Sequence, residues 1–243
     1  ALNADVTSAM KTMVEWAESE DSVRCIIMTG AQPLKPEEGK RAKPHAFVAG
    51  ADITEFLGAG VEEITIKFTD NAIEALWNMS KPTIAMIDGF ALGGGLEVAC
   101  SCDIRFASSR SKFGTPEINL GLIPGYGATQ RLVSLLGYGK ALEMVYTGEM
   151  IGAEEAHRIG LVNHVVEADE LKQKALEMAC LIATKSSHTL RVAKSTMRSA
   201  LDEGLTEGIA TEAKAFAKLF DTEDQEIGVQ AFLNREKAQW KHK

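Results

Sequence analysis

Four glycines between an apolar stretch and a glutamate give the first sign of chemistry in this sequence of 243 residues. They are Gly89, Gly93, Gly94 and Gly95. Residues 83–87 before them have the composition of a buried strand, and the residues after them fit a helix. Glycine lets the backbone approach a ligand closely, and the first N–H groups of a helix lack partners within the helix. The corner therefore suits a negatively charged oxygen, which the helix dipole also favours.

A second corner of the same kind lies near Gly50, where the strand predicted over 46–50 turns toward a helix start capped by Asp52. The amide of Ala51 at this corner and the amide of Gly94 at the first could point at one oxygen. Two converging N–H donors stabilise an oxyanion, and the loss of one typically costs about 3–4 kcal/mol in the activation barrier. The expected target is a polarised carbonyl group.

Two carboxylates accompany these corners. Glu97 lies two residues after the last glycine, and Glu117 follows Pro116 at the start of a predicted short helix. Two glutamates that shared one water would repel each other, so one would hold a proton while the other acted as a base. Such a pair can add water across an activated double bond. Each glutamate could instead be a first-turn residue that the helix dipole stabilises.

Other kinds of active site find little support in the residues. The sequence has no Gly-x-Ser-x-Gly elbow. The glycines at 93–95 and 121–127 lack the spacing of dinucleotide-binding and phosphate-binding loops. The four cysteines lack paired metal spacing, and no histidine has a metal-like partner. We therefore expect no metal and no cofactor.

The charge of the chain bears on its partners. The net charge is -8 at pH 7, so nucleic-acid phosphates and anionic membranes would repel the chain as a whole. We find no apolar run of membrane-spanning length and no signal peptide. We expect no nucleic-acid or membrane partner. The expected location is the bacterial cytoplasm, or the mitochondrial matrix if a leader has been removed.

Short strands alternate with helices up to about residue 166, and the pattern from 170 to 240 is helical with breaks near 186–187 and 221–223. Helices are expected at 3–18, with Asn3 as N-cap, at 61–79 and at 151–159. The polar loop 31–44 is expected to be solvated and mobile. This order favours an α/β core followed by an all-helical C-terminal region.

Four motifs carry a resemblance to a known family. They are Ala46-Phe-Val-Ala-Gly-Ala-Asp-Ile53, Asp88-Gly-Phe-Ala-Leu-Gly-Gly-Gly-Leu-Glu97, Cys102-Asp-Ile-Arg105 and the stretch from Phe113 to Leu132. Together they resemble the crotonase superfamily, and most closely the enoyl-CoA hydratases. The resemblance implies a spiral of strand-strand-helix units with a C-terminal all-helical region. It divides the chain into a core over 1–185 and a helical trimerisation or lid region over 186–243, and it implies a homotrimer or a dimer of trimers.

The resemblance also implies roles for single residues. The amides of Ala51 and Gly94 would form an oxyanion hole for the thioester carbonyl of an acyl-CoA substrate. Glu97 and Glu117 would be the catalytic, water-binding carboxylates, and the amide of Gly125 would help to position the water-binding glutamates. Weaker contacts to CoA are implied at a further set of residues: Ala49, Asp52, Ile53, Phe216 and Arg235.

The implied reaction is the hydration of a 2-enoyl-CoA to a 3-hydroxyacyl-CoA, as in fatty-acid β-oxidation. Isomerisation, hydrolysis or decarboxylation of an acyl-CoA remains an alternative, and so does a non-catalytic RNA-binding role.

Three features depart from the family pattern. Relatives carry an N-terminal strand and hairpin before the position of Ala1, so a truncated or missing N-terminal sheet element is expected. Thr54 stands where relatives often have lysine near the CoA phosphates. The loop 31–44 is longer than in relatives, and its Lys40, Arg41 and Lys43 could reach those phosphates, although solvation is favoured.

Overall fold

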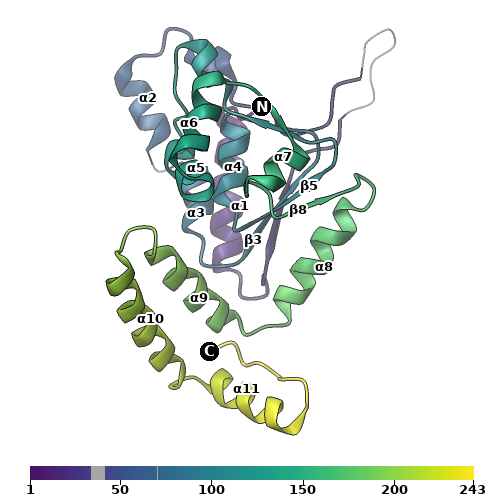
Figure 1. Cartoon of the computed structure of the whole chain (residues 1–243), viewed down its shortest axis with the longest axis vertical. Coiled ribbons are helices and arrows are strands. Elements are labelled where there is room, and N and C mark those ends of the chain that lie inside the picture. Colours follow the sequence, from purple (N-terminus) through teal and green to yellow (C-terminus); the bar gives the residue numbers. More distant parts are fainter. Residues whose placement is uncertain (34–41, 70) are drawn as a thin grey trace.

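The computed structural model describes residues 1–33, 42–69 and 71–243 (Figure 1). In this part of the chain the strands are β1 (Ile26–Thr29), β2 (Ala46–Val48), β3 (Thr83–Ile87), β4 (Phe90–Leu92), β5 (Ile104–Ser108), β6 (Lys112–Gly114), β7 (Ile151–Gly152) and β8 (His164–Val166). The α-helices are α1 (Ala4–Ser19), α2 (Val61–Phe68), α3 (Ala72–Asn78), α4 (Gly94–Ser101), α5 (Ala128–Leu136), α6 (Tyr138–Thr147), α7 (Ala153–Arg158), α8 (Leu171–Ala183), α9 (Ser187–Ser199), α10 (Leu205–Leu219) and α11 (Glu223–Asn234). Two 3-10 helices are η1 (Ile53–Phe56) and η2 (Pro116–Leu120).

The strands of the described residues form two sheets of four strands each. The first sheet has the order β1-β3-β5-β8, and all of its pairs are parallel. The second has the order β2-β4-β6-β7, in which only β6 and β7 pair antiparallel. Consecutive strands such as β3 and β4 therefore enter different sheets before the next helix begins. The predicted strand-strand-helix spiral with a helical C-terminal region is confirmed.

Helix α4 lies in the core, and all eight of its residues are buried. It contacts β2 and β4 of the second sheet as well as helices α3 and α5. Because no face of this helix meets water, its side chains are small or apolar with few exceptions. Glu97 is the acidic residue among them, and it is only 1% exposed. Burial of a carboxylate is costly unless it finds partners, which singles this residue out.

Two expectations about the core elements need correction, and one strand was missed. Strand β4 was not predicted, because three residues between glycines give too short a pattern to detect. The single helix expected over 61–79 is two helices, since Asn71 accepts hydrogen bonds from the amides of Ile73 and Glu74 and starts α3. The helix expected from Ile151 begins at Ala153, after β7. The expected cap of α1 is confirmed, because the Asn3 side chain accepts from the Val6 amide at 2.9 Å.

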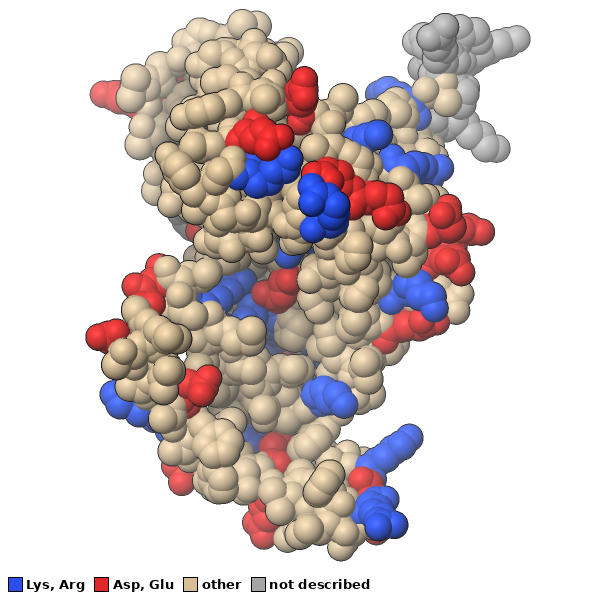
Figure 2. Space-filling model, viewed as in Figure 1, with Lys and Arg blue, Asp and Glu red and all other residues tan. Residues whose placement is uncertain are grey.

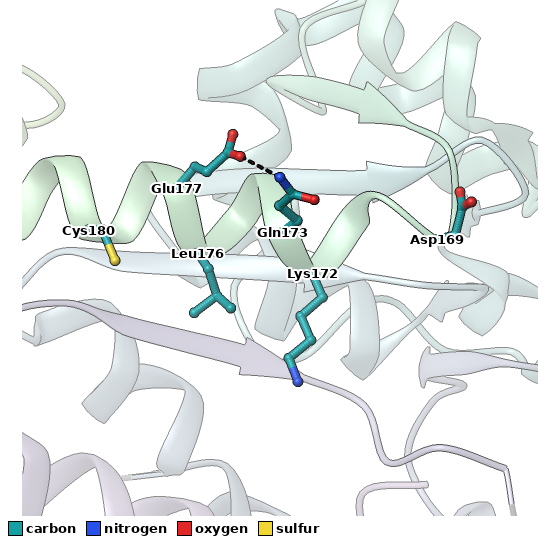
Figure 3. Close-up of a pocket in the computed structure, with 6 residues that line it drawn as sticks. All are labelled: Asp169, Lys172, Gln173, Leu176, Glu177 and Cys180. Atoms are coloured by element: carbon teal, nitrogen blue, oxygen red, sulfur yellow. Dashed lines mark hydrogen bonds between the residues drawn. The ribbon is translucent and has the colours of Figure 1, made fainter.

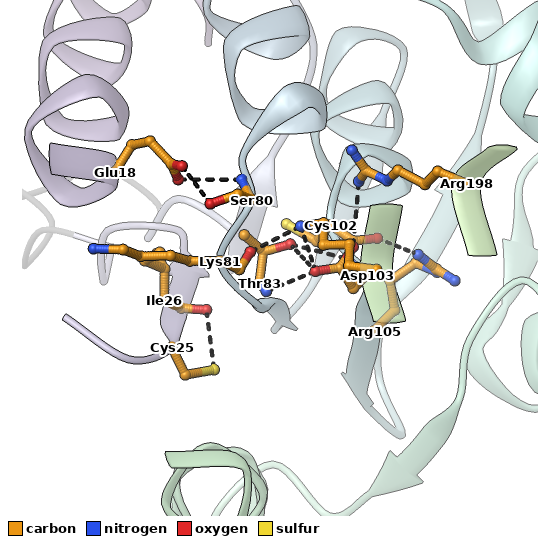
Figure 4. A network of polar contacts seen from close by, with 11 residues as sticks. Glu18, Cys25, Ile26, Ser80, Lys81, Thr83, Cys102, Asp103, Arg105 and Arg198 are labelled. Atoms are coloured by element: carbon orange, nitrogen blue, oxygen red, sulfur yellow. Dashed lines mark hydrogen bonds and ion pairs between the residues drawn. The ribbon is translucent and has the colours of Figure 1, made fainter. Parts of the chain in front are cut away.

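The C-terminal helices α9, α10 and α11 lie at one end of the long axis, below the core in Figure 1. Asp103, just before β5, connects α9 to the core, since it accepts from Lys194 Nζ at 2.7 Å. It also accepts from Arg198 Nη2 at 3.3 Å (Figure 4). The same carboxylate accepts from the amide of Thr83 at 2.9 Å. These contacts fix where the helical region starts.

Two further corrections concern the ends of loops and helices. The helical pattern expected after 170 has a further break at 200–204, which separates α9 from α10. Gly204 is the N-cap residue of α10. Residues after Asn234 leave the helix, because Arg235 has a φ of 58° in the left-handed region. Of the loop 31–44, residues 34–41 lie outside the described part, and so do the predictions for Lys40 and Arg41.

Candidate active site

The two strand-to-helix corners follow β2 and β4, which are neighbouring parallel strands of the second sheet, so the corners lie side by side at the same end of that sheet. Gly50 follows β2 with a φ of 122°, and Gly93 follows β4 with a φ of 53°. Only glycine adopts such angles without strain, so both turns depend on it. A β-carbon on Gly94 would stand 3.8 Å from the amide nitrogen of Ala51. The structure thus brings the two predicted oxyanion donors together.

Both amides are available to a ligand. Within the described residues, neither Ala51 N nor Gly94 N has a hydrogen-bond acceptor. The main chain of Leu2 lies beside Ala51 in a parallel bridge. Leu2 N donates to Gly50 O, and Asp52 N donates to Leu2 O, each at 2.8 Å. The residues on either side of Ala51 are therefore held, while its own N–H group remains open.

Glu97 is held in the first turn of α4 by main-chain donors from a distant loop. Its Oε1 accepts from Tyr126 N at 2.7 Å and from Ala128 N at 3.0 Å. Burial raises the pKa of Glu97 to about 7, and the charge of Glu117 acts in the same direction. The amide hydrogen bonds and the positive charge of Arg131 act against this rise. Glu97 can therefore change its protonation state near neutral pH.

Glu117 comes from η2 and points at the first corner. Its Oε1 lies 2.9 Å from the position that a β-carbon on Gly93 would take. Its Oε2 is buried and has no hydrogen-bond partner among the described residues. Burial raises the pKa of this carboxyl group as well. Glu117 lies in the first turn of η2, but its buried Oε2 lacks a donor in the described chain, so this oxygen can still accept a hydrogen bond from a polar ligand.

Aromatic side chains close the site from the side of α2. The ring of Phe68 stacks on the ring of Tyr126, with centroids 4.1 Å apart and an angle of 11° between the planes. A β-carbon on Gly125 would stand 2.4 Å from Cε1 of Phe68, so the glycine makes this contact possible. Tyr126 in turn lies 3.9 Å from the β-carbon position of Gly94. An apolar wall thus borders the oxyanion donors.

The residues with implied CoA contacts fall into two groups. Ala49, Asp52 and Ile53 flank Ala51, and the Asp52 carboxylate accepts from the Thr54 amide at 3.1 Å. Phe216 in α10 and Arg235 after α11 are exposed. Helices α10 and α11 lie at the opposite end of the long axis from α2 (Figure 1). Within a single chain, Phe216 and Arg235 therefore do not lie near the corners that carry Ala51 and Gly94.

Sequence reasoning missed several residues of the site. The amides that hold Glu97 belong to Tyr126 and Ala128, whereas the prediction named the amide of Gly125. Phe68 and Arg131 were not named at all. The glycines at 125 and 127 did indicate a close approach of the backbone, but the identity of the partner depends on contacts across the fold.

Two surface pockets lie elsewhere. One of about 520 Å³ follows the outer face of α8 (Figure 3). Its lining is Asp169, Lys172, Gln173, Leu176, Glu177 and Cys180. Another of about 290 Å³ lies between α1 and α3. Neither includes the two glutamates.

The described residues contain no group of three or more His, Cys, Asp or Glu side chains placed to hold a metal ion. Outside the segments left undescribed, no helix has the length and apolarity to cross a membrane. On the face in Figure 2, Lys and Arg side chains lie in small groups beside Asp and Glu.

Two amides without acceptors among the described residues lie beside the carboxyl groups of Glu97 and Glu117, on a spiral that contains two mainly parallel sheets. This arrangement defines a class of protein that can polarise a carbonyl and move protons near it. The comparison with known families agrees with this class. The chain belongs to the enoyl-CoA hydratase/isomerase family, whose pattern matches residues 1–243.

Individual relatives are similar over almost the whole chain. The short-chain-enoyl-CoA hydratase of Clostridium acetobutylicum is 39% identical over 239 residues, which cover 98% of this chain and 87% of the relative. The crotonyl-CoA hydratase of Syntrophomonas wolfei is 38% identical over 240 residues, with 98% and 88% covered. The crystal structure of an enoyl-CoA hydratase subunit from Geobacillus kaustophilus superposes with a TM-score of 0.90 at 37% identity, covering 100% of this chain and 90% of that one. The crotonase-like fold inferred from the motifs is confirmed.

Proposed function

We propose that the protein is an enoyl-CoA hydratase that converts a 2-enoyl-CoA to a 3-hydroxyacyl-CoA. The observation that carries the proposal is the placement of the buried Glu97 and the half-buried Glu117, whose Oε2 is buried, beside the open amides of Ala51 and Gly94. Relatives named as hydratases of short-chain enoyl-CoA and of crotonyl-CoA support it.

The thioester carbonyl of the substrate binds the two amides. As charge builds on the carbonyl oxygen, the N–H groups of Ala51 and Gly94 stabilise it more strongly than in the bound substrate, which lowers the barrier. Both donors belong to fixed corners, so they need no rearrangement during the reaction. The carbonyl then acts as the electron sink for addition at the far end of the double bond.

The two glutamates divide the proton transfers between them. One carboxylate removes a proton from water as the water oxygen bonds to C3, and the other carboxyl group delivers a proton to C2. The electrons of the double bond move toward the carbonyl and return to form the new C–H bond. Atoms balance, since one water is added and no other reactant is needed. The raised pKa of Glu97, about 7, allows one proton to be shared within the pair near neutral pH.

The substrate's CoA part would lie along Ala49, Asp52 and Ile53, next to the corner that holds the carbonyl. We further propose that a neighbouring copy supplies Phe216 and Arg235, in a homotrimer or a dimer of trimers. Apolar side chains exposed on the C-terminal helices support such an assembly: Leu205 and Phe232 are each 83% exposed. Bacterial relatives support a cytoplasmic location.

Product analysis tests the function directly. The purified protein is incubated with crotonyl-CoA, the products are separated by chromatography, and their masses are determined by mass spectrometry. A product heavier by one water supports hydration, while release of free CoA would indicate thioester hydrolysis. Conversion of a 3-enoyl-CoA to the 2-enoyl isomer without hydration would identify an isomerase and overturn the proposal.

A further inference from the structure

We propose that Arg131 is a positioning residue of the active site, which holds the loop 125–128 so that the loop's amides grip Glu97. The proposal deepens the proposed function and rests on it for the kinetic part of the test. Within the described residues, Arg131 has no hydrogen bond to Glu97 or Glu117, so it acts on the site through the loop and through its charge.

The guanidinium of Arg131 is buried against the loop. The residue is 8% exposed and lies in the first turn of α5. Its Nη1 donates to Tyr126 O at 2.6 Å, while Nη2 pairs with the carboxylate of Glu74. Its Cζ also lies 4.6 Å from the ring centroid of Trp77. Two side chains of α3 thus fix the guanidinium from the side away from the loop.

The contact with Tyr126 connects Arg131 to Glu97 in one step. The carbonyl of Tyr126 accepts from Arg131, and the amide of the same residue donates to Glu97. The main chain of Tyr126 is therefore held from both sides. If the arginine is lost, the carbonyl loses its partner and the loop is free to move away from Glu97.

Gly127 makes the arrangement possible. Its φ is 99°, and a β-carbon there would stand 2.4 Å from Nη1 of Arg131 and 2.9 Å from its Cζ. Any side chain at this position would both strain the turn and push the guanidinium away from the loop. The position of the Arg131 guanidinium thus depends on a glycine at 127.

Charge gives Arg131 a second effect on Glu97. Four ionisable groups act on this carboxyl group or are affected by its charge: Glu117, Arg131, Cys100 and the hydroxyl of Tyr126. Burial keeps the Cys100 thiol and the Tyr126 hydroxyl neutral near pH 7, because it raises their pKa values to about 11 and about 12. Of these four groups, Arg131 is therefore the positive charge that offsets burial and the charge of Glu117.

Kinetics over a range of pH test the proposal. Arg131→Met is compared with Arg198→Met, a matched control whose guanidinium also lies on Trp77, at 4.0 Å, and pairs with an acid, but has no hydrogen bond or ion pair with residues 125–128 of the described chain. We expect Arg131→Met to lower kcat by about 10- to 100-fold with a small change in KM. We expect the limb of its pH profile that Glu97 governs to move up by about one unit. The control should keep the wild-type profile.

A second measurement does not depend on the reaction. Hydrogen exchange should become faster at the amides of Tyr126 and Ala128 in Arg131→Met and remain slow in Arg198→Met. If the wild type has no hydratase activity, the proposed function fails, but this comparison still decides the role of Arg131. Unchanged exchange and an unchanged pH profile in Arg131→Met would overturn the proposal.

Two other variants cover the case in which Arg131→Met does not fold. Arg131→Lys keeps the charge, so we expect it to lower kcat while its pH profile stays near that of the wild type. Gly127→Ala keeps the arginine but displaces it, and it should speed exchange at the same two amides. Wild-type kcat and exchange in both variants would contradict the inference.

Discussion

Oε1 of Glu117 lies 2.9 Å from the position that a β-carbon on Gly93 would take. Gly93 also has a φ of 53°, so glycine is required there both by the turn and by the carboxylate packed against it. The same turn starts α4, whose first amide is the proposed oxyanion donor Gly94. The position of the Glu117 carboxylate and the direction of the Gly94 N–H group thus both depend on a glycine at 93.

Gly93→Ala should therefore impair both parts of the site. The added β-carbon would strain the turn by about 1–2 kcal/mol and displace the carboxyl group of Glu117. We expect kcat for crotonyl-CoA to fall by about 100-fold, together with a lower melting temperature. Gly139→Ala is the matched control, since nothing lies within 4 Å of its β-carbon position. Wild-type kcat in Gly93→Ala would contradict the geometry.

Removal of one oxyanion donor gives a second prediction. Ala51→Pro has no N–H group, and the wild-type amide has no acceptor among the described residues, so no hydrogen bond within them is lost. We expect kcat to fall by about 100- to 1,000-fold, the typical effect of removing one such donor. Ala51→Ser keeps the amide and should stay close to the wild type. Equal activity of the proline and serine variants, with both shown to be folded by circular dichroism, would rule out the donor.

The buried Glu97 makes stability depend on pH. Its pKa in the folded protein is about 7, above the ordinary value of 4.5, so the folded state binds the proton more tightly. The free energy of unfolding should therefore fall as pH rises from about 4.5 to 7, by about 3 kcal/mol for this group. Glu97→Gln keeps an acceptor for the loop amides but removes the titration. Urea unfolding at pH 5 and 7.5 measures the effect, and an equal change with pH in both proteins would refute it.

Phe68 should limit the length of the acyl chain. Its ring covers Gly125 and stacks on Tyr126, next to the proposed carbonyl site. We expect Phe68→Ala to raise kcat/KM for a ten-carbon 2-enoyl-CoA relative to crotonyl-CoA by about tenfold, because the ring no longer fills that space. Leu57→Ala, a change at a residue 83% exposed in the preceding segment, serves as control. An equal loss of kcat/KM for both substrates in Phe68→Ala would argue against a role of Phe68 in chain-length selection.

The sequence allowed the prediction of the features that depend on neighbouring residues. The glycines, the strand before them and Glu97 lie within 15 residues of one another, so the corner and its carboxylate could be inferred together. Asn3 was recognised as a cap because capping is also a local pattern. The pairing of Ala51 with Gly94 followed from two corners of the same kind.

Features that depend on contacts across the fold could not be predicted. Phe68 contacts Gly125 because α2 folds over the loop, and nothing in the spacing of these residues indicates it. Likewise, Glu97 takes its hydrogen bonds from Tyr126 and Ala128, about 30 residues further along the chain. A charged residue in a helix is usually solvated, so the sequence did not indicate that Arg131 is buried and donates to the carbonyl of Tyr126.

The central claim is that Glu97 and Glu117 act together on one water beside the oxyanion donors. Loss of the conjugated enoyl-thioester absorbance of crotonyl-CoA, followed in the wild type and in Glu117→Gln, tests it most directly. We expect rapid loss with the wild type and a kcat lower by about 10²- to 10⁴-fold in the variant, the range for removal of a general acid or base. Calorimetry should show that the variant still binds an unreactive acyl-CoA with wild-type affinity. Full turnover by Glu117→Gln would contradict the account.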